Sequence, residues 1–495
     1  MSVTSLPSPY GIGTLGKSAR DFVDFLAEAG QTYWQILPLG PTGFGNSPYQ
    51  ALSSFAGNPY LIDLDDLVEE GLLTKDDTAK IKWFKKETAV DYGIQYKYRY
   101  KILRKAADKL PAKHPQEYLQ FLEKEKGWLR DYAVFMAIKD DQEGKSWLQW
   151  PAELRIHSSD AVRQAAEKLH NEVCFYERIQ YLFYKQMMTL KKYANERGVQ
   201  IMGDLPFYVA ADSIDVWAHP EQFEMNDKSE MTFVSGMAPD GGHPKGQKWG
   251  NPLFNWDHMR NTGYDWWISR MEFQCRFCDA MRIDHFQGYD SYFAVPAKDP
   301  DASNGHFRKG PGLDLFRRCE ERIGKRDIIV EDLGILTDDF KRMVKESGYP
   351  GMKILEYAFD PNDPGSVYMP FQYEKNSVVY TGTHDNDTLV GWKNDPDNKD
   401  RVQRAKQYLG LNNTEGFTWG MLRAAYGSVS ELAIIPMQDL LGLGTEARMN
   451  DPHGSIPPWT WRCTKEAFDP KLAKKVKEKM LLYCRNNWNA KQKES

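Results

Sequence analysis

The chain has 495 residues, 41% of them hydrophobic, which is enough to bury a large core. Its 64 Lys and Arg residues against 69 Asp and Glu residues give a formal net charge of −5, so no basic field indicates nucleic acid or an anionic membrane as a partner. No apolar run approaches the ~18 residues of a membrane span, and the opening MSVTSLP does not have the pattern of a signal peptide. Six cysteines spread along the chain fit a reducing compartment, so we expect a cytoplasmic protein.

Short β-type runs recur along the chain, each after a helical stretch, and this alternation predicts βα units around a parallel sheet. The runs cover residues 33–37, 199–202, 280–283, 327–330, 352–355, 378–380 and 432–435. A (β/α)8 barrel needs an eighth strand, and only three residues precede Thr4, so we expect a shortened or missing N-terminal strand. The predicted fold class is α/β, a TIM barrel forming a single catalytic domain over residues 1–495.

Two long segments interrupt the alternation. Residues 63–198 are charged and helix-patterned with little strand signal, which predicts a helical subdomain inserted between two barrel strands. Residues 210–261 are rich in Gly, Pro, Trp and Asp and are interpreted as an irregular insertion carrying a substrate-side loop. The Lys-rich residues 472–495 are expected to form a surface helix that frays.

Two short motifs favour structural roles. Residues 11–16 (GIGTLG) match the G-x-G-x-x-G pattern, but SLPSPY rather than a strand precedes them, so a tight turn feeding a helix over 17–29 is favoured. Cys275 and Cys278 have redox or half-zinc spacing, but no second pair lies nearby, which favours structural thiols. The ten histidines include no H-E-x-x-H pair, which argues against a metal hydrolase.

Carboxylates stand where several predicted strands end. Asp284 follows the apolar run 280–283, Glu331 follows 327–330, and Asp385 lies just beyond 378–380. Each alone is compatible with a surface or salt-bridged acid. Since the carboxyl ends of barrel strands face the active site, three acids at this end together predict a catalytic pocket.

Two such carboxyl groups about 5 Å apart suit retaining glycoside chemistry, in which one attacks the anomeric carbon and the other moves the proton. Arg282 is predicted to keep Asp284 ionised by lowering its pKa. Glu331, beside apolar strand residues, is the predicted proton carrier with a raised pKa. His384 and Asp385 are expected to hydrogen-bond sugar hydroxyls.

The motifs at these positions resemble those of a known family. Residues 282–285 (RIDH), 331–334 (EDLG) and 383–386 (THDN) are similar to the active-site motifs of 4-α-glucanotransferases, the amylomaltases or disproportionating enzymes of the α-amylase clan. More specific matches are 33–41 (YWQILPLGP), 45–50 (GNSPYQ), 57–63 (GNPYLID), 203–208 (GDLPFY) and 247–252 (QKWGNP). The resemblance covers about residues 4–462.

The resemblance implies a role for each matching position. Asp284 would be the nucleophile, Glu331 the acid/base and Asp385 the transition-state stabiliser. The implied substrate-binding residues are Tyr49, Asp204, Arg282, His285, His384 and Asn386, with Asp240, Gln247 and Trp249 on a mobile loop over the acceptor side. Two departures are visible: most of the first barrel strand is lacking, and 457–459 (PPW) stands where Asn before the Trp is expected.

The resemblance also implies the reaction: transfer of α-1,4-linked glucan segments to a 4-hydroxyl of glucose or another glucan, with no metal and no organic cofactor. The partners would be α-1,4-glucans, maltooligosaccharides and glucose, with the oligomeric state open between a monomer and a weak homodimer. The alternatives are an α-amylase-type hydrolase, a non-catalytic glucan-binding protein, and a phosphate-binding isomerase using 440–444 (LLGLG). Preference for transfer over hydrolysis rests on the resemblance and on a lid-like composition of 236–252, which would exclude water.

Overall fold

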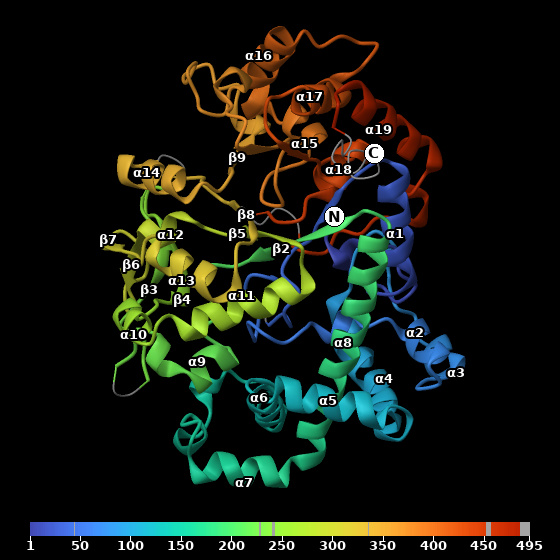
Figure 1. Ribbon diagram of the computed structural model, residues 1–495, viewed down its shortest axis with the longest axis vertical. Helices are drawn as coiled ribbons and strands as arrows, with labels where there is room; N and C mark the ends of the chain where they lie inside the picture. The colour runs from blue at the N-terminus through green and yellow to red at the C-terminus, as the bar shows by residue number, and fades with distance from the viewer. Residues whose placement is uncertain (44, 227–228, 240–242, 335, 452–456, 486–495) are drawn as a thin grey trace.

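A computed structural model describes residues 1–495 except 44, 227–228, 240–242, 335, 452–456 and 486–495. Its centre is a seven-stranded parallel sheet curved as a barrel, in the order β1-β2-β5-β8-β9-β10-β11 (Figure 1). The strands are β1 (Tyr33–Gln35), β2 (Gln200–Leu205), β5 (Ala280–Ile283), β8 (Asp327–Val330), β9 (Gly351–Ile354), β10 (Ser377–Tyr380) and β11 (Leu432–Ile434). The predicted TIM-barrel class and all seven predicted strands are confirmed.

The barrel is filled by its own side chains. Inward-facing residues of neighbouring strands form one buried cluster, made of Met202, Ala280, Ile329, Met352, Ile354, Val378 and Tyr380. The hydroxyl of Tyr380 donates to Oε1 of Gln35 at 3.0 Å, which links β10 to β1 through the interior. Because both faces of these strands are covered, their sequences are short apolar runs, and this is why they were predictable.

No strand precedes Tyr33 among the described residues, as the short N-terminus predicts. Residues Val3–Ser5 form a 3-10 turn (η1), and Trp34 Nε1 donates to the carbonyl of Met1 at 2.7 Å, so the first residues lie beside β1. Cys463 N donates to the carbonyl of Ser5 at 3.0 Å. The N-terminal residues are therefore held between β1 and the segment around 461–463.

Helices surround the barrel. The longer ones outside residues 64–196 are α1 (Lys17–Glu28), α11 (Asp265–Phe277), α13 (Asp314–Ile323), α14 (Asp338–Ser347), α16 (Lys399–Leu409), α17 (Phe417–Tyr426) and α19 (Pro470–Leu482). Shorter ones are α9 (Ile214–Ala218), α10 (Trp256–Asn261), α12 (Gln287–Asp290), α15 (Leu389–Asn394) and α18 (Met437–Leu441). No helix in the described part of the chain is long and apolar enough to cross a membrane.

Between β1 and β2 the chain forms α2 (Leu64–Glu69), α3 (Lys75–Ala79), α4 (Tyr92–Lys113), α5 (Pro115–Glu125), α6 (Leu129–Asp141), α7 (Asp160–Lys168) and α8 (His170–Glu196). Helices α4 to α7 gather at one end of the molecule (Figure 1). Helix α8 packs against α4 and α6, and also against α1 and β2 of the barrel. It therefore fixes this helical group to the barrel.

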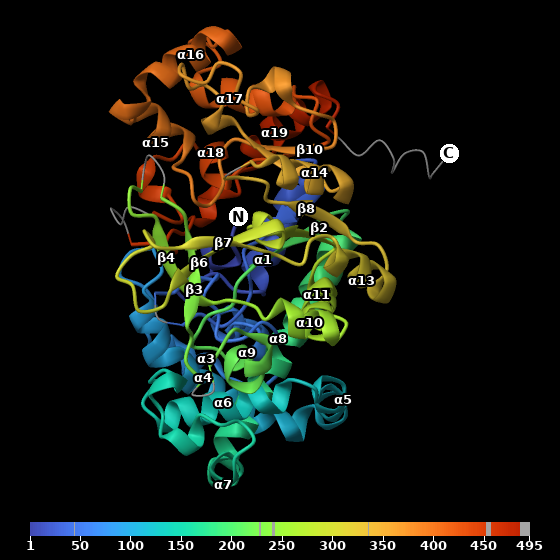
Figure 2. The same cartoon turned by 90° about the vertical axis from the view of Figure 1, so that its left-hand side faces the viewer.

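The segment 210–261 is not irregular, which corrects the sequence interpretation. Strands β3 (Phe233–Met237) and β4 (Gln247–Pro252) form a hairpin, which pairs with β6 (Ser291–Pro296) and β7 (His306–Lys309) in a four-stranded antiparallel sheet. Figure 2 shows this sheet standing beside the barrel. The sequence does not reveal this sheet because β4 contains Gly and Pro, and because β6, the second partner of β3, lies beyond residue 290.

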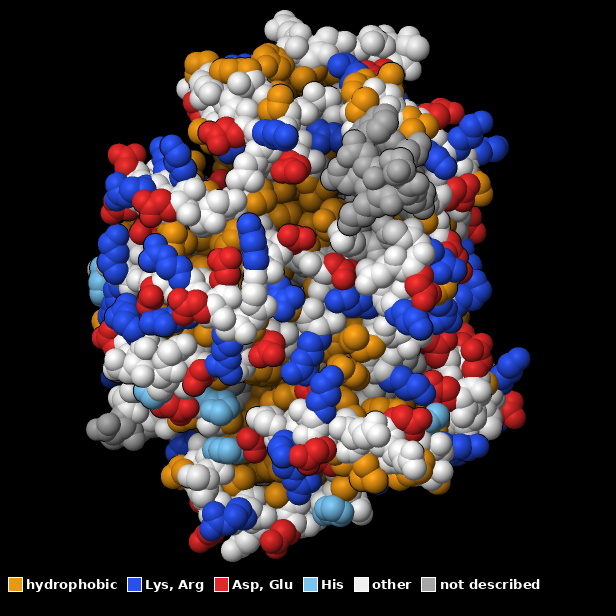
Figure 3. Space-filling view, viewed as in Figure 1, with side chains coloured by type: hydrophobic (Ala, Val, Ile, Leu, Met, Phe, Trp, Pro, Cys, Tyr) orange, Lys and Arg blue, Asp and Glu red, His pale blue; other side chains and the backbone are white. Residues whose placement is uncertain are grey.

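The surface carries charge of both signs. On the face shown in Figure 3, Lys and Arg side chains alternate with Asp and Glu, in keeping with 64 positive and 69 negative residues in the chain. Such a surface favours solubility without steering the protein to one type of polyion.

Gly57→Ala tests the contact between the 57–63 loop and α8. A Cβ at Gly57 would lie 2.0 Å from the Phe183 ring. The side chain of Gln180 also forms hydrogen bonds with the N–H and the carbonyl of Gly57, at 2.7 and 2.9 Å. Overpacking here is expected to cost about 1–3 kcal/mol and lower the Tm. The control Gly127→Ala has no heavy atom within 4 Å and should change stability by less than about 0.5 kcal/mol. Equal Tm values for the two variants would contradict this packing.

Candidate active site

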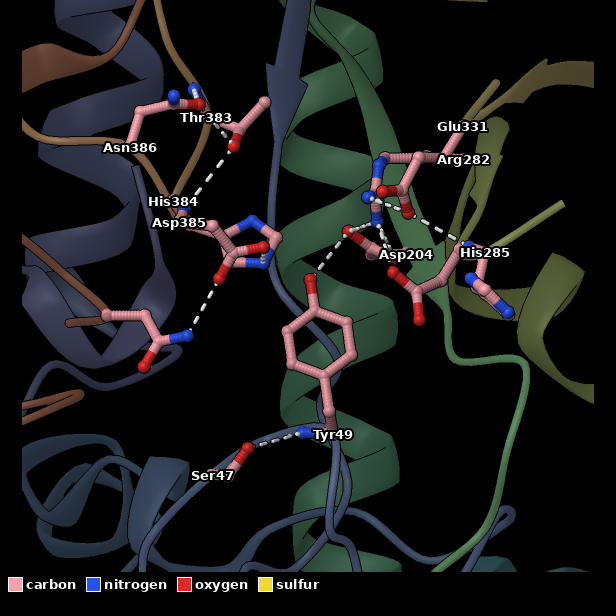
Figure 4. A network of polar contacts seen from close by, with 12 residues as sticks. Ser47, Tyr49, Asp204, Arg282, His285, Glu331, Thr383, His384, Asp385 and Asn386 are labelled. Atoms are coloured by element: carbon pink, nitrogen blue, oxygen red, sulfur yellow. Dashed lines mark hydrogen bonds and ion pairs between the residues drawn. The ribbon is translucent and has the colours of Figure 1, made fainter. Parts of the chain in front are cut away.

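Polar side chains from separate strands meet at the carboxyl end of the barrel (Figure 4). Asp204 lies on β2 beside Arg282 of β5, where the two residues are register partners. Asp284 and Glu331 follow β5 and β8, and the 383–386 turn follows β10. The structure therefore brings together the carboxylates that the sequence placed at strand ends.

Arg282 is the hub of this cluster and is only 3% exposed. Its Nη1 donates to both carboxylate oxygens of Asp204 at 2.7 Å and to Oδ1 of Asp284 at 3.1 Å. Its Nη2 donates to Oε2 of Glu331 at 2.7 Å. A buried guanidinium needs such charge-assisted partners, since an unpaired buried charge is very costly.

His285 has a backbone conformation that few side chains adopt, with φ of +46°. This conformation aims its backbone N–H at Oε2 of Glu331, 2.9 Å away. The imidazole is held by Phe207, Tyr208 and Trp249, with ring centroids 5.7, 6.1 and 5.3 Å away. Backbone strain of about 1–3 kcal/mol at such a position is typical of functional sites.

Asp284 and Glu331 share a hydrogen bond, and their pKa values move in opposite directions. Burial, and then the charge of Glu331, raises the pKa of Asp284 well above its usual range despite Arg282. For Glu331, burial is outweighed by Arg282, the N–H of His285 and the Asp284 hydrogen bond, which lower its pKa. The predicted directions of these two pKa shifts were therefore wrong, because Glu331 receives the stronger set of hydrogen-bond donors.

Tyr49 lies between this cluster and the 383–386 turn. Its hydroxyl donates to Oδ2 of Asp204 at 3.0 Å, and its ring stacks on His384 with centroids 5.0 Å apart. Trp459 lies beside both rings, 5.9 Å from Tyr49 and 5.8 Å from His384. Aromatic faces grouped beside carboxylates suit the apolar face and hydroxyl edge of a sugar ring.

Asp385 is accessible to solvent, and its side chain is 49% exposed. Although desolvation by the surrounding chain opposes its charge, His384 and a hydrogen bond from Asn450 Nδ2 (2.7 Å) hold the pKa of Asp385 well below its usual range. Burial also opposes charge on His384, yet Asp385 raises the pKa of His384. Asp385 therefore remains a carboxylate over the whole physiological pH range.

The remaining predicted residues lie around this core. Trp249 on β4 is 37% exposed, and its Nε1 donates to Oε1 of Gln247 at 2.9 Å. The amide oxygen of Asn386 accepts from the N–H and hydroxyl of Thr383, both at 2.9 Å. Asp240 lies outside the described residues. The substrate-binding roles of these residues stay predictions.

Some residues of the site were not predicted. Trp459 and Asn450 complete the stacking group and the Asp385 environment, and Tyr208 covers His285. Asn450 carries no sequence signal, because a single Asn in a loop is ordinary. Trp459 has φ of +62°, which only the folded backbone reveals.

The two short motifs lie away from this chemistry. A Cβ at Gly16 would lie 2.1 Å from the carboxyl of Asp63, so Asp63 occupies the start of α1 where a nucleotide phosphate would have to bind. Cys278 is a buried free thiol. In the described part of the chain, no group of three or more His, Cys, Asp or Glu side chains is arranged to hold a metal ion.

Carboxyls gathered around one arginine, next to aromatic rings and at the strand ends of a barrel, are typical of barrel enzymes that act on glycosidic bonds. A family model described as 4-alpha-glucanotransferase matches residues 1–467. The 4-alpha-glucanotransferase of Clostridium butyricum is 42% identical over 486 residues, covering 98% of this chain and 100% of the relative. That of Thermus thermophilus is 41% identical, covering 94% of each chain.

A solved structure agrees with these sequence comparisons. The amylomaltase of Streptococcus agalactiae in complex with acarbose is 38% identical, with a TM-score of 0.95 over 98% of this chain and 99% of that one. The chain belongs to the 4-alpha-glucanotransferase family. It is a transferase acting on glucans, and the hydrolase alternative is not favoured.

Arg282→Met tests how much the ion pairs of Arg282 contribute to stability. Without the guanidinium, Asp204 and Glu331 lose their ion-pair partner, and breaking such a network costs about 3–5 kcal/mol. Their folded-state pKa values would then lie above the unfolded ones, so stability is lost as the pH rises through the folded-state values and regained as the pH falls. We expect a larger Tm deficit at pH 8 than at pH 5, measured by calorimetry.

Arg322→Met is the matched control, because Arg322 pairs with Asp265 on the surface and both side chains are largely exposed. Its loss should cost less than about 1 kcal/mol at either pH. A deficit for Arg282→Met that is the same at both pH values would argue against buried carboxylates as its cause.

Proposed function

We propose that the enzyme moves α-1,4-linked glucan segments from a maltooligosaccharide or starch-type donor to the 4-hydroxyl of glucose or another glucan. The observation that carries the proposal is the Asp284–Glu331 pair, in which both carboxyls accept hydrogen bonds from Arg282. The resemblance to an amylomaltase bound to acarbose supports the choice of substrate class.

The first half of the reaction breaks the donor. Glu331 gives its proton to the glycosidic oxygen while the carboxylate of Asp284 attacks the anomeric carbon. The donor C–O bond breaks, a glycosyl–Asp284 ester forms, and the shortened glucan leaves with the proton. This step needs the proton of the pair on Glu331, so the sugar has to favour that arrangement against a raised pKa of Asp284 and a lowered pKa of Glu331.

The second half reverses these steps with a new partner. The acceptor 4-hydroxyl attacks the anomeric carbon as Glu331 takes its proton, and the ester bond to Asp284 breaks. Two inversions leave the α configuration unchanged. Asp385, held ionised by His384 and Asn450, would stabilise the positive charge that develops on the sugar ring in both halves.

Transfer requires that an acceptor sugar reaches the ester before water does. Trp249 and Gln247 lie on β4, beside the His285 end of the site, where an acceptor ring can stack. We propose that the β3–β4 hairpin forms the acceptor side and helps to exclude water. The same proposal keeps residues 63–198 as an inserted helical subdomain and 210–261 as the insertion that carries this loop.

The proposal also covers the location, the partners and the oligomeric state of the enzyme. We place it in the cytoplasm, without nucleic-acid or membrane partners, as a monomer or a weak homodimer. We expect activity with no added metal or organic cofactor.

Incubation with maltotriose alone tests the function. The expected result is free glucose together with a ladder of longer maltooligosaccharides, resolved by chromatography, because each released glucose leaves a maltosyl ester that another sugar can attack. Asp284→Asn removes the nucleophile and should lower the rate by at least 10³-fold at unchanged Tm. Glucose and maltose without longer products would mean hydrolysis instead.

α-Maltosyl fluoride separates the roles of the two carboxyls, because fluoride leaves without a proton. Glu331→Gln should accept this donor, accumulate the glycosyl ester, and regain turnover with azide as the nucleophile, giving an α-azide. Asp284→Ala with azide should give a β-azide, since only one inversion occurs. The opposite pairing of products would exchange the two assignments.

The pH dependence of kcat/KM follows from the shared proton. The active form of the pair carries one proton, so activity falls on the acid side when Glu331 is also protonated and on the alkaline side when Asp284 loses the proton. Because the pKa of Glu331 is lowered and that of Asp284 raised, the two limbs lie farther apart than usual carboxyl values of about 4.3 and 3.9 would place them. With α-maltosyl fluoride as the donor, the pH profile of Glu331→Gln should no longer fall on the alkaline side. An unchanged alkaline fall would mean that it comes from a group outside the Asp284–Glu331 pair.

A further inference from the structure

Glu356 is a buried acid directly behind the turn that carries Asp385. It lies on the 3-10 helix η6 (Leu355–Tyr357), which follows β9 at the same end of the barrel as the active site. It is 2% exposed, and its backbone N–H donates to the carbonyl of Thr381 at 3.2 Å. In the described part of the chain its Oε1 has no hydrogen-bond partner, which is unusual for a buried carboxyl and asks for an explanation.

The charged groups that face Glu356 are mostly acids. Asp439 on α18 accepts from Thr381 Oγ1 at 2.6 Å, and Asp387 accepts from Thr445 Oγ1 at 2.7 Å. Arg448, a cation that acts on Glu356, donates to the carbonyl of Asp385 at 2.7 Å. Burial, followed by Asp439 and Asp387, raises the pKa of Glu356 well above its usual range.

Asn386 connects Glu356 to the turn. The amide of Asn386 hydrogen-bonds the Glu356 carboxyl, while its amide oxygen accepts from the N–H and hydroxyl of Thr383. A Cβ at Gly382 would lie 3.1 Å from Cβ of Asn386 and 3.3 Å from Cδ of Glu356, so the contact leaves no spare room. Figure 4 shows the Asn386 and Thr383 side chains together on one part of the turn, with the carboxylate of Asp385 pointing away from them.

We propose that Glu356 is a positioning residue, which fixes the 383–386 turn through Asn386 and so holds Asp385 in place against the transition state. It acts through Asn386 and does not touch the sugar. The inference rests on the role proposed for Asp385. A raised pKa suits this position, because an ionised Glu356 would add a negative charge close to Asp439 and Asp387, behind the carboxylate of Asp385.

Two substitutions at Glu356 separate its shape from its hydrogen bonding. Glu356→Gln keeps a neutral group that can accept from Asn386, and we expect kcat for maltotriose transfer within about threefold of the wild type. Glu356→Leu has a similar side-chain volume but cannot form the hydrogen bond with Asn386. Because a small misplacement of a catalytic group can cost about 10²-fold, we expect kcat to fall about 10- to 100-fold while KM changes less than about twofold.

Glu125 offers the matched control, since it is 1% exposed and ion-paired with Arg276 at 2.8 Å, outside the catalytic site. Glu125→Leu should lower the Tm without changing kcat at temperatures where the protein is folded. If Glu356→Leu does not fold, Gly382→Ala perturbs the same contact from the other side and should lower kcat in the same way.

The inference would be overturned by wild-type kcat in Glu356→Leu and Gly382→Ala, or by a Glu356→Gln variant as slow as Glu356→Leu. Asp385→Asn distinguishes the two levels of the proposal. Full activity of Asp385→Asn would overturn the role of Asp385 and the inference with it. An inactive Asp385→Asn beside a fully active Glu356→Leu would overturn the inference alone.

Discussion

The active site depends on one buried cation. Arg282 is nearly inaccessible, and its guanidinium can remain there only with carboxylates around it, which come from β2, β5 and the end of β8. Asp204 and Arg282 are register partners on adjacent strands, so a slip of one residue between β2 and β5 would send one of them to the wrong face. The ion network therefore requires the same register that the hydrophobic interior of the barrel requires.

Charge balance explains why a proton stays in this cluster. Three carboxyls meet one guanidinium, and ionising all of them would leave two uncompensated negative charges in a buried place. Retaining one proton removes one of those charges. Which carboxyl keeps it is decided by hydrogen bonding: Glu331 receives Arg282 Nη2 and the N–H of His285, whereas Asp284 has the longer bond to Nη1.

The sequence predicts the parts of this enzyme that repeat a simple pattern. Buried parallel strands are short apolar runs, and an acid directly after such a run lies at the mouth of the barrel, so Asp284, Glu331 and Asp385 were found together. The sheet containing β3 and β6 was missed because its strands lack clear alternation and pair across distant segments. The direction of the pKa shift at Glu331 was missed because it depends on the left-handed backbone of His285, and the contact of Asn450 with Asp385 joins residues 65 positions apart.

The two carboxylates that flank the sugar differ in how their charge is secured. Asp385 is ionised before substrate arrives, because His384 and Asn450 stabilise its charge. In the proposed mechanism Asp284 has to be ionised to act as the nucleophile and Glu331 has to be protonated to act as the acid, so both roles depend on the position of one proton in the pair. Coupling of this kind favours transfer, because the same pair meets the acceptor in a site that is already occupied by sugar.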